Sequence, residues 1–211
     1  MATHDVLVAA ITTAFPTVGH TISFDELTFQ LGADQIIDVL RFCKDDEAVQ
    51  AELLSDLSGV HWPAGEEVIE RQPGTTGWPD HVTSRDAGVI DVQYVLRSLK
   101  LGHWLRLAVR VSDVDPVVPS STAVYPQAAN FHEREVFDMF GVDFTDHPNL
   151  ERILMPEDWI GHPHRKDYPL GGVDIPYKND KHIPPPNERD LRVVTEARGE
   201  GVTDLPGEAV S

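Results

Sequence analysis

Residues 131–170 read FHEREVFDMFGVDFTDHPNLERILMPEDWIGHPHRKDYPL, and the interpretation of the other residues depends on them. The stretch begins with Phe131, Val136 and Phe140 at helical spacing and with charged residues between them. This pattern predicts an amphipathic helix. Gly141 would end that helix, because glycine takes the left-handed conformation of a helix cap without steric cost.

The residues after Gly141 show no helical or strand period and are dense in proline, glycine, histidine and aromatic residues. A run of about 30 residues without secondary structure is unusual inside a compact domain. Its large side chains must be buried either against the rest of the chain or against another protein, and composition does not choose between the two. These side chains are Phe144, Leu150, Ile153, Leu154, Trp159 and Tyr168.

Six short runs in this stretch resemble, in order and spacing, the block that identifies the thirty-kilodalton subunit family, the C subunit of respiratory complex I (the proton-pumping NADH:quinone oxidoreductase). Two positions depart from the family pattern, since Asp146 stands where the family has glycine and His164 where it has leucine. The N-terminal residues match the family only in layout. The matching runs are Glu133-Arg134-Glu135, Asp138-Met139-Phe140-Gly141, His147-Pro148, Arg152-Ile153-Leu154, Gly161-His162-Pro163 and Arg165-Lys166-Asp167-Tyr168-Pro169-Leu170.

The composition excludes several classes of partner. The chain has 211 residues and a net charge of −18, from 35 acidic and 17 basic residues. Nucleic acid and anionic lipid both require clustered lysine and arginine, so direct binding to either is not expected. No run approaches the roughly 20 apolar residues of a membrane-spanning helix, and residues 1–15 lack the basic region of a signal peptide. We therefore expect a soluble, cytosolic protein that reaches the membrane only through partners.

The same residue counts argue against a cofactor on this chain. Cys43 is the single cysteine, so neither an internal disulfide nor a four-cysteine iron–sulfur site can form. No Walker A loop is present, and the glycines at 199 and 201 follow no predicted strand, as a dinucleotide motif would require. Cys43 falls on the apolar stripe of a predicted helix, which favours an inert buried thiol. We expect no cofactor-binding and no catalytic residues.

Periodicity predicts an α+β fold. The expected unit is a two-layer N-terminal domain, residues 1–140, with helices on one side of a mixed sheet of three to five strands. An extended segment, residues 141–186, would wrap a partner subunit, and a polar tail, residues 187–211, would be poorly ordered alone. Residues 63–80 are rich in turn-forming residues and predict a mobile loop. Helices are expected at 3–15, 33–45 and 123–140, and strands at 21–31, 57–62, 89–99 and 104–111, the last two joined by a hairpin at 100–103.

A metal site is the main alternative interpretation of the histidines. His132-Glu133 begins like a zinc-protease motif, but the motif needs a second histidine where the chain has Val136. Histidines beside prolines more often bind loop carbonyls or face a partner, so no metal ligands are predicted. The side chains that would otherwise be candidates are His132, Glu135, His147, His162 and His164.

The charged residues of the stretch have two interpretations. Arg134 and Asp138, four residues apart, could pair on a solvated helix face, where such a pair contributes only about 0.3–0.5 kcal/mol. The resemblance instead implies that these charges meet a partner, and that Arg165-Lys166-Asp167 docks on its acidic surface with Tyr168 and Leu170 as anchors. The predicted partner-docking residues are Glu133, Arg134, Glu135, Asp138, Phe140, His147, Arg152, Trp159, His162, Arg165, Lys166, Asp167 and Tyr168.

The resemblance also implies a function. The chain would be a cofactor-free structural and assembly subunit of the peripheral arm, a non-catalytic part of a translocase. It would dock on the quinone-site (D) subunit, near the B and I subunits, at the cytoplasmic face of the plasma (inner) membrane. Electrons would pass from NADH through FMN and Fe–S clusters in partner subunits to quinone, coupled to proton translocation.

Three alternatives stay open from the sequence. The first is the equivalent subunit of a membrane-bound hydrogenase-like or deazaflavin-linked dehydrogenase complex, in which only the electron donor would differ. The second is a metal-dependent hydrolase. The third is an acidic interaction module with a single unrelated partner.

Overall fold

The computed structural model describes residues 4–65, 68–70, 81–83 and 86–169. The chain divides into two compact units, Met1–Asp167 and Tyr168–Ser211. Only Tyr168 and Pro169 of the second unit are described, so the fold below is that of the first. The predictions for most of residues 63–80, for residues 170–186 and for the tail at 187–211 lie outside the described residues.

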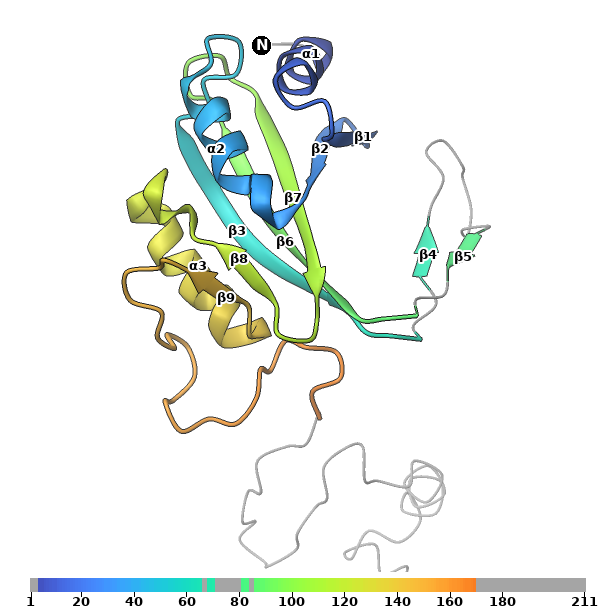
Figure 1. Ribbon diagram of the computed structural model, residues 1–211, viewed down its shortest axis with the longest axis vertical. Coiled ribbons are helices and arrows are strands. Elements are labelled where there is room, and N and C mark those ends of the chain that lie inside the picture. The colour runs from blue at the N-terminus through green and yellow to red at the C-terminus, as the bar shows by residue number, and fades with distance from the viewer. Residues whose placement is uncertain (1–3, 66–67, 71–80, 84–85, 170–211) are drawn as a thin grey trace, which may run out of the picture. The chain divides into compact units, whose positions relative to one another are not determined.

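A mixed sheet forms the centre of the first unit (Figure 1). It has five strands in the order β1-β2-β7-β6-β3; β2 and β7 are parallel and the other neighbours antiparallel. This arrangement confirms the predicted α+β fold class. The helices are α1 (His4–Ala14), α2 (Ile36–Asp45) and α3 (Pro126–Phe140), with 3-10 turns η1 (Ala33–Gln35) and η2 (Ser121–Ala123). The strands are β1 (Gly19–Ser23), β2 (Glu26–Leu31), β3 (Leu53–Trp62), β4 (Val68–Glu70), β5 (His81–Thr83), β6 (Val89–Arg97), β7 (Trp104–Ser112), β8 (Val117–Pro119) and β9 (Asp143–Thr145).

The hydrophobic core lies on one face of the sheet. Leu57, Tyr94 and Leu107 lie side by side on β3, β6 and β7, and all three are buried. Val95 and Ala108, which point to the opposite face, are only half-buried. Helices α1 and α2 bury apolar residues in the same core, and α2 crosses the sheet in Figure 1. The expected placement of helices on one side of the sheet therefore agrees with the burial pattern.

Residues 21–31 form a hairpin, not the single strand that was predicted. Strands β1 and β2 are antiparallel, and the turn between them is made by Phe24 and Asp25, with φ of 51° and 65°. Two successive residues with positive φ are the pattern of a tight type I′ hairpin turn. Neither residue is glycine or asparagine, so the turn was not recognisable from residue type. The charged pair at 25–26 was read as weakening one strand, whereas it belongs to the turn and the start of the next strand.

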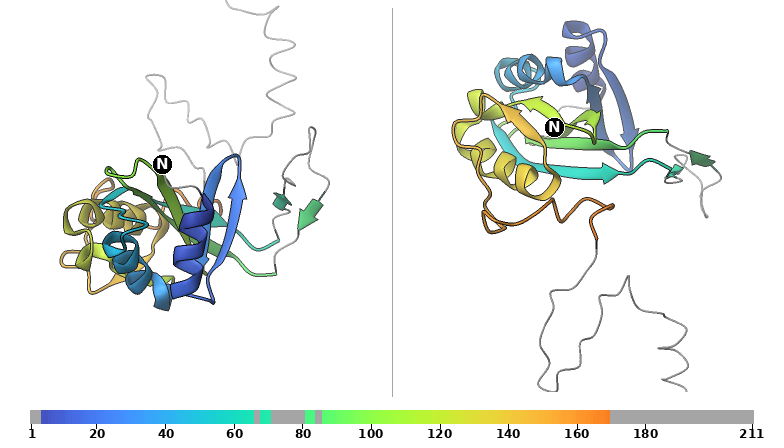
Figure 2. Two further views of the ribbon diagram at one scale, coloured as in Figure 1. Left: turned by 90° about the horizontal axis from the view of Figure 1, so that it is seen from above. Right: turned by 60° about the horizontal axis from the view of Figure 1, so that its bottom comes forward.

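Helix α3 joins the N-terminal fold to the residues after it. Ser120 caps the turn before it by accepting a hydrogen bond from the Thr122 backbone N–H, and Pro126 occupies the first turn of the helix. As predicted, Gly141 ends the helix. Its φ is 73°, and its N–H donates a hydrogen bond to the Phe137 carbonyl. Strands β8 and β9, on either side of this helix in the sequence, pair in parallel beside it (Figures 1 and 2). Three-residue strands are too short to show a period, so this pair was not predicted.

Close packing of α3 on the sheet depends on one glycine. A Cβ atom on Gly59, in β3, would lie 2.7 Å from the ring of Phe140. No side chain could occupy that position without moving the helix or the ring. Phe140, one of the predicted docking residues, is therefore largely buried against its own domain.

Candidate docking site

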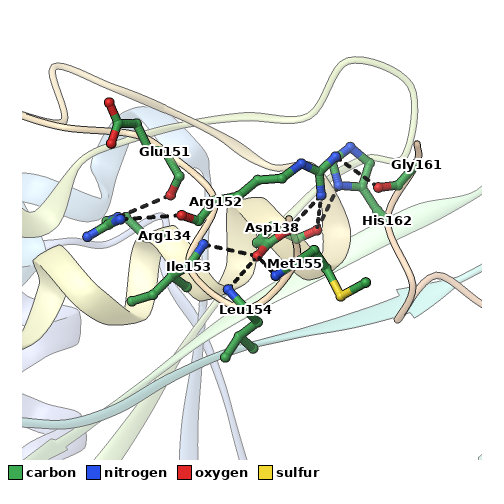
Figure 3. Close-up of polar contacts among 9 residues, drawn as sticks. All are labelled: Arg134, Asp138, Glu151, Arg152, Ile153, Leu154, Met155, Gly161 and His162. Carbon is green, nitrogen blue, oxygen red and sulfur yellow. Dashed lines mark hydrogen bonds and ion pairs between the residues drawn. The ribbon is translucent and has the colours of Figure 1, made fainter. Parts of the chain in front are cut away.

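The carboxylate of Asp138 organises the residues that follow α3 (Figure 3). The side chain is 0% exposed, and it accepts hydrogen bonds from Arg152 Nη1 at 2.6 Å and from three successive backbone N–H groups, those of Ile153, Leu154 and Met155, at 3.0, 2.8 and 2.8 Å. Burial alone would raise the pKa of Asp138, but these four donors hold it below its usual range. The carboxylate therefore stays ionised and binds the chain 14 to 17 residues further on.

Two arginines complete this arrangement. Arg152 also donates from Nη2 to the Gly161 carbonyl at 3.0 Å. Arg134 donates to the carbonyls of Glu151 and Arg152 at 3.1 and 3.4 Å. The alternative in which Arg134 and Asp138 pair with each other on a solvated helix face is not observed, because each side chain is directed to the loop. We call residues 150–161 the pinned loop.

The C-terminal end of α3 is covered by the next residues of the chain. The last carbonyls of a helix have no partners within it. Here Nδ1 of His162 donates to the Asp138 carbonyl at 3.0 Å. The His164 N–H donates to the Met139 carbonyl at 3.1 Å, and Arg165 Nε donates to the Phe140 carbonyl at 2.6 Å. Residues 162–167, which we call the strap, thus donate to three carbonyls that have no partner within the helix. The first compact unit accordingly extends to Asp167, past residue 140, the predicted end of the N-terminal domain.

A buried histidine holds the end of the strap. His61, in β3, accepts a hydrogen bond at Nδ1 from the Lys166 N–H at 3.0 Å. Because Nδ1 is an acceptor, a neutral ring carries its proton on Nε2, which lies 3.4 Å from Asp113 Oδ2. Asp167 lies 3.6 Å from the same ring, and the Lys166 ammonium sits 4.9 Å from the centre of the Trp62 ring. Neither His61 nor Asp113 was a candidate, because the contact spans 105 residues of sequence.

Glu133 has a similar internal role at the other end of α3. Its carboxylate is 0% exposed and accepts hydrogen bonds from Ser120 Oγ at 2.6 Å and from the N–H and Oγ of Ser121 at 2.6 and 2.5 Å. Burial raises the pKa of Glu133, while the serine hydrogen bonds and nearby His147 act in the opposite direction. Nε2 of His147 donates to the Asn130 carbonyl at 3.2 Å. Glu133 and His147 therefore bind their own domain.

The large apolar side chains of residues 141–170 fall into a buried set and an exposed set. Phe144 is buried, and Leu150 and Met155 pack against the core, so the stretch folds back on its own domain. Leu154 and Ile160, by contrast, are 58% and 87% exposed. Phe144 and Leu150 are therefore placed against the rest of the chain, the first of the two destinations considered, whereas burial of Leu154 against another protein stays a prediction. Neither Leu154 nor Ile160 belongs to the predicted docking set. The exposed or half-buried members of that set include Arg134, Glu135, Arg152, Trp159, His162, Arg165, Lys166, Asp167 and Tyr168.

The departure from the family pattern at Asp146 does not remove the turn. Its φ is 62°, in the left-handed region that glycine adopts most easily. Aspartate is among the few other residues that tolerate this region. His164, the second departure, packs its ring edge against Phe140 with ring centres 5.6 Å apart.

Two negative findings concern the described residues. Among them, no group of three or more histidine, cysteine, aspartate or glutamate side chains is arranged to hold a metal ion. Over the same residues, no helix combines the length and apolarity needed to cross a bilayer.

The fold and the site define an α+β domain in which the C-terminal end of α3 is hydrogen-bonded to the pinned loop, and that loop exposes aliphatic side chains. The model of the family described as respiratory-chain NADH dehydrogenase, 30 Kd subunit, matches residues 29–174. The chain belongs to this family.

Three relatives are each named as the C subunit of NADH-quinone oxidoreductase. Those of Acidothermus cellulolyticus, Mycolicibacterium gilvum and Streptomyces coelicolor are 43%, 41% and 41% identical over 78% of this chain, and the match covers 74%, 63% and 57% of their own lengths. A solved structure described as Nqo5 in a trypsin-resistant fragment is 25% identical and covers 71% of this chain and 100% of its own, with a TM-score of 0.48. Because this TM-score is too low to support a fold assignment, the fold class rests on the strand order and helices of this chain.

Proposed function

We propose that this chain is a structural subunit of an NADH-quinone oxidoreductase, without a cofactor or an active site of its own. The pinned loop and the strap would dock on the quinone-site (D) subunit, with the B and I subunits nearby, in a peripheral arm at the cytoplasmic face of the membrane. FMN and Fe–S clusters in other subunits would carry electrons from NADH to quinone. The family membership and the names of the relatives support the assembly.

One observation carries the docking role. Asp138 and Arg152 fix the backbone of the pinned loop, and the loop then exposes Leu154 and Ile160 to solvent. A rigid loop loses little conformational entropy when it binds, so exposed apolar side chains on it are efficient anchors. Ordering this loop would otherwise cost roughly 1–2 kcal/mol per residue for the backbone. The intramolecular hydrogen bonds meet much of that cost before a partner arrives.

The buried acids fit this role better than a catalytic one. Glu133 and Asp138 accept hydrogen bonds from serine, arginine and backbone N–H groups of their own domain, and both carboxylates are closed to solvent. A proton donor or acceptor in catalysis must reach its substrate directly or through one water. Mutations here would therefore change the enzyme indirectly, through the amount of assembled complex.

The test places a charge on the loop surface. Leu154→Asp and Ile160→Asp in the full chain should lower the amount of assembled oxidoreductase in native membranes at least about tenfold, since each buries a charge in a desolvated contact. The rate of NADH-dependent quinone reduction per assembled complex should stay unchanged.

Val6→Asp is the matched control, because Val6 is also an exposed aliphatic residue, on α1. It should leave assembly at the wild-type level. Normal assembly of the two loop variants, together with a loss of turnover per complex, would contradict the structural role.

A further inference from the structure

The two edges of the five-stranded sheet are built differently. The edge strand β3 carries a register shift between Leu54 and Asp56, a β-bulge that ends on an exposed charged residue. Bulges, charges and prolines are devices by which proteins prevent further strands from pairing with a sheet edge. Strand β1, at the opposite edge (Figure 1), has none of the three: Gly19–Ser23 reads GHTIS and pairs without a register shift. Its only strand neighbour among the described residues is β2.

The outer side of β1 leaves four backbone groups without a partner. The hairpin of β1 and β2 closes on the pair Ser23–Glu26 across a two-residue turn, and the closing pair of such a turn is hydrogen-bonded. In an antiparallel ladder, hydrogen-bonded pairs alternate with pairs whose N–H and C=O point away from the partner strand. The outward-pointing residues of β1 are therefore His20 and Ile22. No described group forms a hydrogen bond with the backbone N–H or C=O of either residue on that side.

Two exposed hydrophobic side chains accompany these backbone groups. Ile22 is 42% exposed and lies opposite the buried Leu27, so it continues the core face of the sheet to its edge. Phe24, at the tip of the hairpin, is 83% exposed and has a φ of 51°. A positive φ is sterically costly for a bulky residue, and glycine or asparagine would form the same turn without that cost. Because so much of its ring is in solvent, Phe24 contributes little to the core and can contact a partner.

We propose that β1 pairs with a strand of another protein. The occupant is an extended segment whose backbone bonds His20 and Ile22 and which carries a basic residue beside Asp25. Unpaired strand groups require an extended backbone, because a helix satisfies its own N–H and C=O groups. The basic residue is expected because the side chain of Asp25 is 97% exposed, with only His4 near it at 3.7 Å, and because residues 1–60 contain ten acids and two bases.

The choice of occupant excludes a second copy of this chain, since two chains of −18 repel each other. The inference rests on the proposed function only in expecting the added strand within the same assembly. The sheet edge at β1 is formed by residues other than those of the pinned loop and the strap, so the two contacts can be tested separately.

Amide hydrogen exchange of the wild-type chain tests the pairing directly. In the isolated full chain, the amides of His20 and Ile22 should exchange rapidly, while those of Thr21 and Ser23, which bond to β2, should exchange slowly. In assembled complex from native membranes, the amides of His20 and Ile22 should exchange at least about tenfold more slowly than in the isolated chain. Thr21 and Ser23 are the internal control and should be slow in both. Equal exchange of His20 and Ile22 in the two samples would overturn the inference.

A proline at an outward-pointing position separates backbone pairing from side-chain contact. Ile22→Pro removes an outward N–H and leaves the bonds to β2, because proline is tolerated at an edge where the N–H faces away from the sheet. Ile22→Ala is the matched control, which shortens the side chain and keeps the N–H. The urea midpoints of the two isolated chains should agree. In the assembled complex, the His20 amide should exchange about tenfold faster in Ile22→Pro than in Ile22→Ala, and equal rates would contradict strand addition.

A photo-cross-linker attached to Thr21→Cys identifies the occupant. Thr21 is exposed and points to the face opposite to its neighbours in β1. Cys43 does not compete for the reagent, because burial raises the pKa of its thiol to about 12. The expected product joins residue 21 to an extended segment of another subunit, with a basic residue in it. A product that joins two copies of this chain would overturn the inference. Failure of the proposed function would look different, because the tagged chain would then bring down no oxidoreductase subunits at all.

Discussion

At the residue scale, the structure depends on buried carboxylates that are satisfied by their own chain. Asp138 accepts three backbone N–H bonds and pairs with Arg152, while Glu133 is held by Ser120 and Ser121. A buried charge is costly unless such donors replace water. The two acids thus join α3 to the loop that follows it and to the turn that precedes it.

Replacement of Asp138 by asparagine tests this role. The variant keeps the size of the side chain but removes the charge, and its amide N–H₂ would face Arg152 or the loop N–H groups. We expect the free energy of unfolding of the full chain to fall by about 3 kcal/mol, as for other broken buried pairs. Urea unfolding measures it. Asp143→Asn, at an exposed position in β9, should change it by less than about 0.5 kcal/mol.

The wild-type chain and Asp138→Asn should also differ in how their stability depends on pH. The pKa of Asp138 is lowered in the folded state, so its ionisation contributes stability that is fully present above its unfolded value, near 3.8. That contribution is lost as pH falls through the folded pKa. The stability difference between wild type and Asp138→Asn should therefore be constant from about pH 5 to 7 and shrink below pH 3.8. A difference that grows on acidification would contradict the assigned sign.

At the element scale, regular patterns were predictable and long-range contacts were not. The alternating strands β6 and β7, the helix at 33–45 and the helix end at Gly141 follow from period and residue type. The turn at Phe24–Asp25 and the three-residue strands β8 and β9 carry no such signal. The resemblance drew attention to Asp138, but the identity of its partners depends on how an aperiodic loop folds, which no local rule describes.

The strap should depend on a residue from a distant strand. His61→Ala would remove the His61 acceptor of the Lys166 N–H at a part-buried site, a loss of about 1–1.5 kcal/mol. We expect the strap to open more often, so that trypsin cleaves the folded chain after Arg165 and Lys166 about tenfold faster. His132→Ala is the control, because His132 is half-exposed on α3. Unchanged cleavage of His61→Ala would show that the contacts of His162, His164 and Arg165 with the end of α3 hold the strap without His61.

At the scale of the whole molecule, the first compact unit presents two surfaces of different chemistry. The pinned loop exposes the aliphatic Leu154 and Ile160, and strands β6 and β7 expose Arg97 and Trp104. The net charge of the whole chain is −18, which disfavours self-association by like-charge repulsion.

The central claim is that this chain acts as a docked subunit of an NADH-quinone oxidoreductase. The most direct measurement is purification of the tagged full chain from native membranes in mild detergent, followed by mass spectrometry, flavin and iron analysis and an assay of quinone reduction. We predict a large assembly that contains flavin and iron and reduces quinone with NADH but not with hydrogen or a reduced deazaflavin. Recovery of a lone monomer, or of a complex that does not oxidise NADH, would contradict the claim.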